Sequence, residues 1–190
     1  MNTKSIMIVG VGGQGSLLAS KLLGRLLVDE GFDVKVSEVH GMSQRGGSVV
    51  TYVRFGEKVY SPIVTEGEAD VIISFEKLEA ARYAPFLKKG GRIVVNTQQI
   101  DPMPVIIGLA EYPENVLDEL KAKGVNVEDF DALTPAIEAG SSKAVNIVLM
   151  GRAAKYFDIP KENWIKAIEN TVAPKFIEMN KKAFELGYNS

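Results

Sequence analysis

Cysteine is absent from the 190 residues, and histidine occurs once, as His40. Without cysteine the chain can form no disulfide bond, no thiolate nucleophile, and no cysteine-ligated zinc site or iron–sulfur cluster. A single histidine cannot build a multi-histidine metal site or a pair of catalytic imidazoles. If this chain takes part in redox chemistry, the electron carrier is therefore a bound organic cofactor or lies on another chain.

A surplus of one charge sign and a long apolar run are absent as well. Lys and Arg number 22 and Asp and Glu 24, for a net charge of −2 at pH 7, whereas a nucleic-acid-binding domain normally has a basic surplus. No apolar stretch approaches the roughly 20 residues that span a bilayer, and glycines interrupt the apolar run 6–9 before it resembles a signal peptide. We therefore expect a cytoplasmic protein with no nucleic-acid or membrane partner.

The length and composition predict one domain. The chain is 46% hydrophobic and 24% charged, which is ordinary for a globular protein, and its length is short for two domains. No internal repeat, low-complexity tract or linker-like segment divides it. We therefore expect a single domain that spans residues 1–190.

Strands and helices alternate in the predicted secondary structure. Short apolar or β-branched runs predict strands at residues 6–9, 33–39, 48–55, 71–74, 92–95, 105–108 and 125–130. Helical spacing and capping residues predict helices at 16–30, 76–87, 113–123 and 143–156, and two more that begin near Pro160 and Pro174. The predicted fold class is α/β, a three-layer Rossmann-like domain with a helical C-terminal third.

The connection between the second and third predicted strands is short. About eight residues, 40–47, separate them, whereas a crossover between parallel strands usually needs a dozen or more. These two strands, if adjacent, are therefore expected to run antiparallel. The sheet is then mixed and mostly parallel, unlike that of a standard dinucleotide-binding domain.

A glycine-rich motif lies directly between the first predicted strand and the first predicted helix. Residues 10–15, G-V-G-G-Q-G, satisfy the pattern G-x-G-x-x-G, in which glycines permit a tight turn and helix amides face an anion. A dinucleotide site also needs an acid after the second strand, and Glu38, about 28 residues after Gly10, is the candidate. Three interpretations stay open: helix-on-strand packing, an anion site, and a nicotinamide or flavin site.

A second motif concentrates polar residues and glycines after the second predicted strand. Residues 38–47 read E-V-H-G-M-S-Q-R-G-G, and in an open α/β sheet ligands bind at this edge. Arg45 could clamp a carboxylate or phosphate, and His40 could act as an acid or base, so these two are the catalytic candidates. The alternative is a surface loop whose Arg and His are solvated.

Other polar residues favour structural roles. Ser74, Glu76, Asn96 and Thr97 follow predicted strands and are interpreted as helix caps or turn residues. Asn146, in an apolar helix, is interpreted as a buried amide that locks a loop. The sequence contains no P-loop, no nucleophile elbow and no close carboxylate pair, so it predicts no self-sufficient catalytic site.

Several segments together resemble one family. In chain order they are the motif at 10–15, Glu38 with Ser43-Gln44-Arg45-Gly46-Gly47, Ser61-Pro62-Ile63, Ala69-Asp70, and Asn146 with Gly151. This pattern resembles the gamma-type subunit or domain of 2-oxoacid:ferredoxin oxidoreductases. The resemblance covers essentially the whole chain and is greatest to the small (beta) subunit of indolepyruvate ferredoxin oxidoreductases.

The resemblance implies a complex that oxidatively decarboxylates a 2-oxoacid to an acyl-coenzyme A and reduces ferredoxin. Thiamine diphosphate and iron–sulfur clusters are implied on a large partner subunit, and this chain, inactive alone, completes the coenzyme A and substrate side. Met42 and Ser43 stand where pyruvate-type members have a tyrosine-containing segment, which favours indolepyruvate or another aryl pyruvate. The binding candidates from the residues and the resemblance are Gly10, Gly12, Gly13, Gln14, Gly15, Glu38, Ser43, Gln44, Arg45, Gly46 and Gly47.

Two other hypotheses remain open at this point. The chain could be a stand-alone nucleotide-dependent oxidoreductase that uses Gly10, Gly12, Gly15 and Glu38 for a dinucleotide. It could also be a scaffold module whose glycines are structural only.

Overall fold

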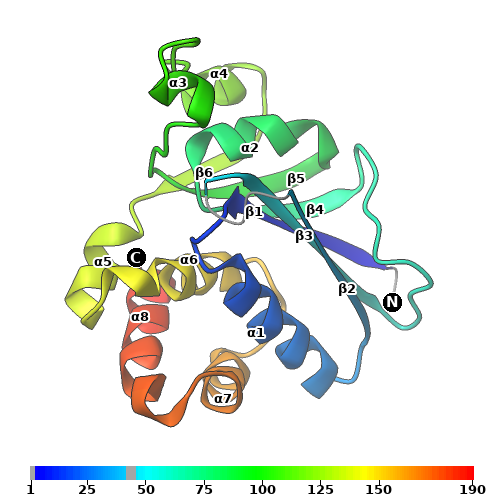
Figure 1. The fold of residues 1–190 in the computed structure, drawn as a ribbon. Helices are drawn as coiled ribbons and strands as arrows, with labels where there is room; N and C mark the ends of the chain where they lie inside the picture. The colour runs from blue at the N-terminus through cyan, green and yellow to red at the C-terminus, as the bar shows by residue number, and fades with distance from the viewer. Residues whose placement is uncertain (1–2, 42–45) are drawn as a thin grey trace.

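The computed structural model describes residues 3–41 and 46–190, and within them six strands form one sheet in the order β2-β3-β1-β4-β5-β6. β1, β4, β5 and β6 pair in parallel, whereas β3 runs antiparallel to both β1 and β2. The mixed, mostly parallel sheet is thus confirmed, and so is the antiparallel pairing of the second and third strands. The chain crosses from β1 to β2 through α1, and β3 occupies the place between them (Figure 1).

The strand bounds lie close to those predicted from the apolar runs, except that β5 begins at Leu87, five residues before the predicted strand 92–95. The strands are β1 (Lys4–Val11), β2 (Asp33–His40), β3 (Ser48–Gly56), β4 (Ala69–Ser74), β5 (Leu87–Asn96) and β6 (Val127–Phe130).

Helices account for most of the remaining chain and dominate its C-terminal third. They are α1 (Ser16–Asp29), α2 (Lys77–Tyr83), α3 (Met103–Ile106), α4 (Val116–Ala122), α5 (Leu133–Ala139), α6 (Val145–Ala154), α7 (Lys161–Thr171) and α8 (Ile177–Asn189), with short 3₁₀ turns at Ala84–Phe86, Ser142–Ala144 and Pro174–Phe176.

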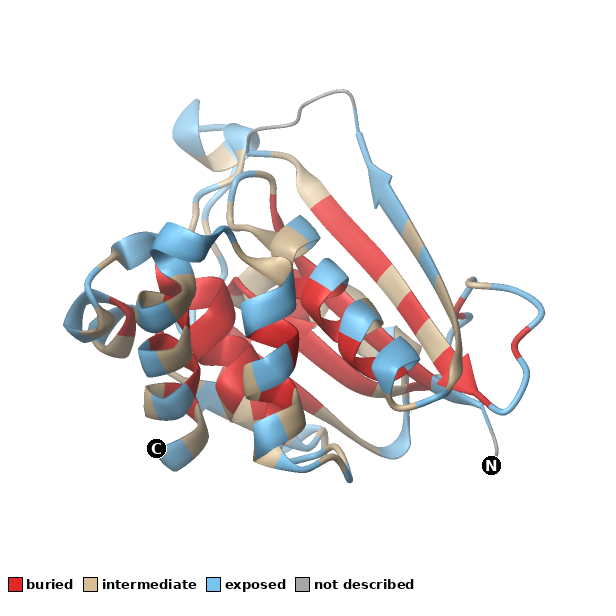
Figure 2. Ribbon diagram, turned by 90° about the horizontal axis from the view of Figure 1, so that it is seen from below, coloured by how far each residue is buried: buried red, intermediate tan, exposed pale blue. Residues whose placement is uncertain are grey.

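Helices cover both faces of the sheet, which gives the predicted three layers (Figure 1). Successive side chains of β1 point to opposite faces. Ile6 and Ile8 pack in the core shared with α1, α6 and α8, whereas Met7 and Val9 pack in the core beneath α2 and α4. All four are at most 2% exposed, so β1 is the buried centre of the sheet (Figure 2).

Two glycines let α6 and α8 cross with their backbones in contact. A Cβ atom built on Gly187 of α8 would lie 1.9 Å from the Val148 carbonyl oxygen, and one on Gly151 of α6 would lie 2.2 Å from the Phe184 carbonyl oxygen. No side chain larger than hydrogen fits at either position without the helices moving apart. The C-terminal helix is thereby held directly against the buried helix α6.

The prediction of a strand at residues 105–108 is wrong. This segment begins as the short helix α3 and turns at Gly108, whose φ is +73°. Pro102 caps α3 and Pro104 lies in its first turn, where the fixed φ of proline suits a helix. The helix α5 was not predicted, because its seven residues are too few to show a helical period and Pro135 lies among them.

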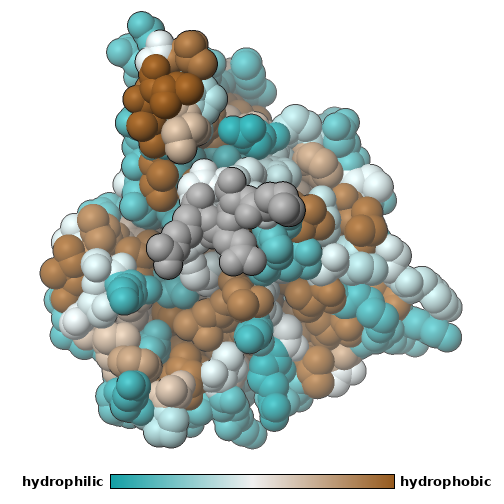
Figure 3. All heavy atoms as spheres, in the orientation of Figure 1, coloured by the Kyte–Doolittle hydropathy of each residue, from teal (hydrophilic) through white to brown (hydrophobic). Residues whose placement is uncertain are grey.

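Residues 100–113, called the arm below, project from the sheet and carry exposed apolar side chains. Met103, Ile106, Ile107 and Leu109 are 58–79% exposed, and hydrophobic atoms gather over this part of the surface (Figure 3). Within the residues that the structure describes, no helix is both long enough and apolar enough to cross a membrane.

Candidate functional site

The glycine motif lies where the sheet changes the side of its helical connections. α1 follows β1 on one face and α2 follows the neighbouring β4 on the other, and ligands of open α/β sheets bind at such a point, beyond the carboxyl ends of the strands. The turn requires left-handed backbone at Gly13 and Gly15, whose φ angles are +103° and +85°. A Cβ on Gly13 would meet nothing within 4 Å, so this part of the loop is open.

Gln14 fastens the loop to the strand ends. Its Oε1 accepts a hydrogen bond from the Val11 amide at 2.7 Å, and its Nε2 donates to the Phe75 carbonyl at 2.9 Å and to Gln98 Oε1 at 3.2 Å. A Cβ on Gly10 would lie 2.9 Å from Gln14 Oε1. Gln14 and Gly10 therefore shape the loop, while Gly12, Gly13 and Gly15 line the space in front of it.

Asn146 supports the far end of the same loop. Its side chain is buried at 4% exposure, and its Nδ2 donates to the Gly15 carbonyl at 3.2 Å. A Cβ on Gly15 would approach that nitrogen to 2.5 Å. The predicted role of Asn146, a buried amide that locks a loop, is confirmed.

The second strand brings Glu38 and His40 toward the glycine loop. A Cβ on Gly24 of α1 would lie 3.5 Å from Val36 Cγ2, so the face of β2 that carries Val36 also carries Glu38 and His40 toward α1. Together with Gly12, Gly13, Gly15, Ser16, Leu17 and Val49 these two residues line a cavity of about 480 Å³, called the β2 cavity below.

A larger cavity lies on the other side of the loop. Its volume is about 700 Å³, and it is lined by Gly12, Gly13, Gln14, Gly15, Gln98, Ile100, Leu133, Ser142, Lys143 and Val145. We call it the α6 cavity. Gly15, the cap of α1, and the exposed Lys143 both border it, and its lining contains no acidic residue. The Lys143 ammonium group therefore gives this cavity a positive charge.

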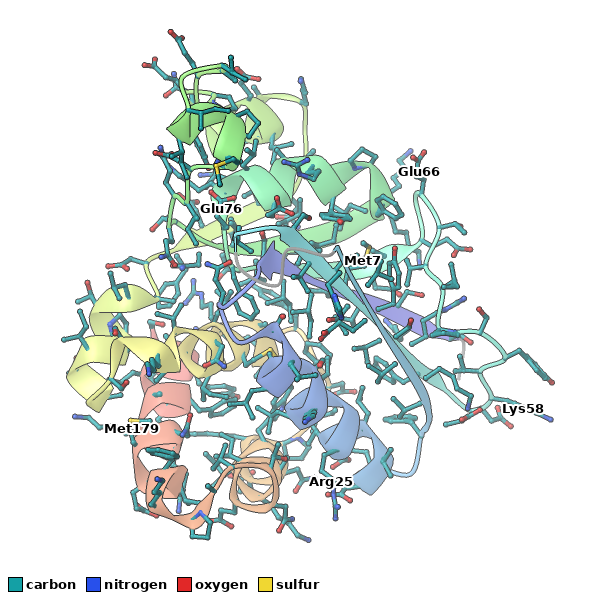
Figure 4. The ribbon with its side chains drawn as sticks, viewed as in Figure 1. Met7, Arg25, Lys58, Glu66, Glu76 and Met179 are labelled. Carbon is teal, nitrogen blue, oxygen red and sulfur yellow. The ribbon has the colours of Figure 1, made fainter. Side chains whose placement is uncertain are left out.

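A buried polar cluster lies on the opposite face of the sheet, at the start of α2. Glu76 caps α2 by accepting from the Glu79 amide at 2.9 Å, and it accepts from the Tyr112 hydroxyl at 2.5 Å (Figure 4). Burial and then the hydrogen bond to Glu76 raise the pKa of the Tyr112 phenol. Ser74 donates to the Glu76 carbonyl and Asn96 donates to the Phe75 carbonyl, so these residues are caps and ties, as predicted.

The structure brings most of the predicted site residues to one edge of the sheet. Gly12, Gly13, Gly15, Glu38 and His40 share the β2 cavity, while Gly46 and Gly47 line a further cavity of about 510 Å³ on the α2 side, beside the arm. Ser43, Gln44 and Arg45 lie outside the described residues.

Lys143 is the cationic residue that sequence analysis did not single out. It follows the capping Ser141, whose hydroxyl accepts from the Lys143 amide at 3.2 Å. Lys143 opens the predicted helix 143–156, where the helix dipole disfavours a lysine, and this is the signal that could have identified it. Its position across from the glycine loop depends on the long chain between β5 and α6, which no local pattern specifies.

The fold and the glycine loop define the class of protein: an α/β domain with an open glycine loop at the switch point of a mixed sheet. The sequence model described as "Pyruvate ferredoxin/flavodoxin oxidoreductase" matches residues 5–190. The chain belongs to this family. It is 48% identical to the indolepyruvate oxidoreductase subunit IorB of Thermococcus kodakarensis, over 98% of this chain and 95% of that protein.

Solved structures share the fold. The pyruvate oxidoreductase subunit PORC of Thermotoga maritima has a TM-score of 0.75 at 21% identity, over 100% of this chain and 97% of that chain. The 2-oxoglutarate:ferredoxin oxidoreductase of Magnetococcus marinus, solved with 2-oxoglutarate, coenzyme A and succinyl-CoA, has a TM-score of 0.69 at 18% identity. This match covers 100% of our chain but 31% of that one, so the same fold occurs there within a longer polypeptide.

Proposed function

We propose that this chain is the small subunit of an indolepyruvate-type 2-oxoacid:ferredoxin oxidoreductase. The complex converts an aryl pyruvate and coenzyme A into an acyl-coenzyme A and carbon dioxide, and two electrons reduce ferredoxin. The observation that carries the proposal is the 48% identity to an indolepyruvate oxidoreductase subunit over nearly the whole length of both chains.

We assign the redox and decarboxylation chemistry to a large partner subunit. The sequence has no cysteine to ligate an iron–sulfur cluster, so the clusters do not fit this chain. The family resemblance implies that thiamine diphosphate is bound by the same partner. Its own contribution is therefore the binding and orientation of anionic ligands at the glycine-loop edge.

Charge distinguishes the two cavities at that edge. The Glu38 carboxylate lines the β2 cavity and repels an anion, whereas the Lys143 ammonium group lines the α6 cavity and attracts one. We assign a phosphate of coenzyme A to the α6 cavity, with the amides of Gly13 and Gly15 beside it. Arg45 is proposed from the sequence as a second cationic contact, and His40 as an acid or base at the β2 cavity.

The position of Glu38 also bears on the nucleotide alternative. In a dinucleotide site the acid follows the strand next to the glycine strand. Here β3 separates β2 from β1, which moves the acid outward by one strand spacing of about 4.8 Å. Because of this shift, Glu38 is too far out to contact the ribose of a dinucleotide whose phosphates are bound by the loop amides.

Co-purification from the native cells tests the proposal. A tagged chain should recover a large subunit that contains thiamine diphosphate and iron–sulfur clusters, and the complex should reduce ferredoxin with indolepyruvate only when coenzyme A is present. Recovery of no such partner contradicts the subunit assignment. Tight NADH or flavin binding and turnover by the isolated chain would support the stand-alone alternative instead.

Variants of the recovered complex test the assignment of the α6 cavity. Lys143→Ala should raise the KM for coenzyme A about five-fold, the effect of about 1 kcal/mol from a partly solvated charge contact. Lys166→Ala, which removes an exposed lysine of α7, is the matched control. Arg45→Ala separates binding from scaffolding, because unchanged coenzyme A and 2-oxoacid kinetics would indicate a scaffold role for that motif.

A further inference from the structure

A buried carboxylate on α2 accepts a hydrogen bond from β3, the strand that follows the second glycine motif. Glu79 is 4% exposed, and its Oε2 accepts a hydrogen bond from the Ser48 hydroxyl at the start of β3. Its Oε1 lies 3.1 Å from Nε of the half-exposed Arg82. Burying a carboxylate is costly unless it is hydrogen-bonded, and here both oxygens have a partner.

Helix capping alone does not account for this arrangement. Glu79 occupies the third helical position after the capping residue Glu76, where a glutamate usually reaches back to the backbone amide of the cap. The carboxylate instead faces Ser48, 31 residues away in the chain. Burial raises the pKa of Glu79, and the contacts with Ser48 and Arg82 act in the opposite direction, so these partners favour the charged form.

Ser48 is continuous with the backbone that holds the glycine loop. It pairs with Val11 at the end of β1 and directly follows Gly47. The Gly12 amide donates to the Gly47 carbonyl at 2.8 Å, and the Gly46 amide donates to the Gly12 carbonyl at 3.4 Å. Residues 46–48, called the stem below, therefore connect the Glu79 carboxylate to the open glycine loop through adjacent hydrogen bonds.

We propose that Glu79 is a positioning residue, which acts through Ser48 to hold the stem against the glycine loop in the geometry that binds coenzyme A. Glu79 and Ser48 act from the α2 face of the sheet, opposite the α6 cavity where the anion is assigned. The residue touches no ligand itself. The inference rests on the proposed function for its kinetic consequence, but its structural consequence at Gly12 can be measured independently.

The test uses the purified complex and Ser48→Ala, which removes the donor with little change in volume. Loss of a hydrogen bond to a charged group should raise the KM for coenzyme A by up to about ten-fold with kcat nearly unchanged. Hydrogen–deuterium exchange of the Gly12 amide should accelerate by a similar factor. Ser48→Thr, which keeps the hydroxyl, should restore both values toward those of the parent protein.

Two further variants make the outcome decisive. Glu79→Met, which removes both carboxylate oxygens with little change in volume, should show the same two changes, and adding Ser48→Ala to it should add little, because both substitutions remove the Ser48–Glu79 hydrogen bond. Arg82→Ala removes the partner of the other carboxylate oxygen and should leave both readouts near the parent values. Equal effects of Arg82→Ala and Ser48→Ala would overturn the proposal.

The remaining outcomes also decide the question. Reduced thermal stability with unchanged Gly12 exchange and unchanged KM would show that the bond only stabilises α2, and faster exchange with unchanged KM would show that the stem does not position the ligand; either overturns the proposal. If the parent complex shows no dependence on coenzyme A, the proposed function fails. The exchange rate of Gly12 then still reports whether Glu79 and Ser48 hold the stem.

Discussion

Replacement of Gly187 by alanine should destabilise the protein far more than a one-methyl change usually does. The new Cβ would lie 1.9 Å from the Val148 carbonyl oxygen, whereas real Cβ contacts stay beyond about 3.0 Å. α6 and α8 must therefore separate by about 1 Å at a fully buried crossing. The obstacle is backbone within a helix, which cannot rotate away as a side chain can.

The magnitude follows from two opposing effects. Overpacking of this severity costs about 3 kcal/mol or more, and alanine returns about 1 kcal/mol of helix propensity relative to glycine. The net loss is about 2 kcal/mol at least. For a chain of this length the melting temperature should fall by about 4–8 °C, as measured by circular dichroism or calorimetry.

Gly24→Ala in α1 is the matched control. Its Cβ would meet Val36 Cγ2 at 3.5 Å, an ordinary contact, so the propensity gain is not opposed and the melting temperature should rise by about 2–4 °C. The argument from backbone contact would be refuted if Gly187→Ala were as stable as the parent protein. It would also be refuted if the melting temperatures of both variants shifted in the same direction.

Two further substitutions test the site and its surroundings. Gly15→Ala should lower the urea midpoint of unfolding, with a loss of about 1–2 kcal/mol from the left-handed backbone added to the clash with Asn146; an unchanged midpoint would contradict the assigned turn. Asp131→Ala should cost about 1 kcal/mol at neutral pH, because the Asp131 carboxylate accepts from the Leu133 amide at 2.9 Å and from the Thr134 hydroxyl at 2.6 Å. These contacts lower the pKa of Asp131 below its usual value of 3.8, so its stabilising effect is present above that pH and fades as the pH falls further. A difference between variant and parent that grows on acidification would contradict this assignment.

The sheet was largely predictable because its signals are local. β-branched runs bounded by glycine mark buried strands, and the length of the connection 41–47 excludes a parallel crossover between β2 and β3. The segment 105–108 was mispredicted because a short apolar run does not distinguish a strand from a helix. An apolar run predicts a buried strand only if its side chains enter the core, whereas those of Ile106 and Ile107 are exposed on the arm.

The site was predictable only in part, for a similar reason. The glycine pattern and Glu38 belong to the ends of strands, and their convergence follows from sheet topology. Lys143 and Glu79 reach the same region through contacts between distant segments, Glu79 from the opposite face of the sheet. No local sequence pattern around Lys143 or Glu79 indicates which loop that residue will face.

The antiparallel strand also has a consequence for the order in which the sheet assembles. β3 must enter between β1 and β2, which α1 already links. Pairing β3 with β2 closes only residues 41–47, whereas pairing it with β1 closes the chain from Val11 to Ser48, about five times longer and entropically costlier by about 1.4 kcal/mol. The β2–β3 hairpin should therefore form first and dock on β1 as a unit. The seven residues between β2 and β3, which carry most of the second glycine motif, thus join the two strands of the hairpin that forms first, and their number limits the register of those strands.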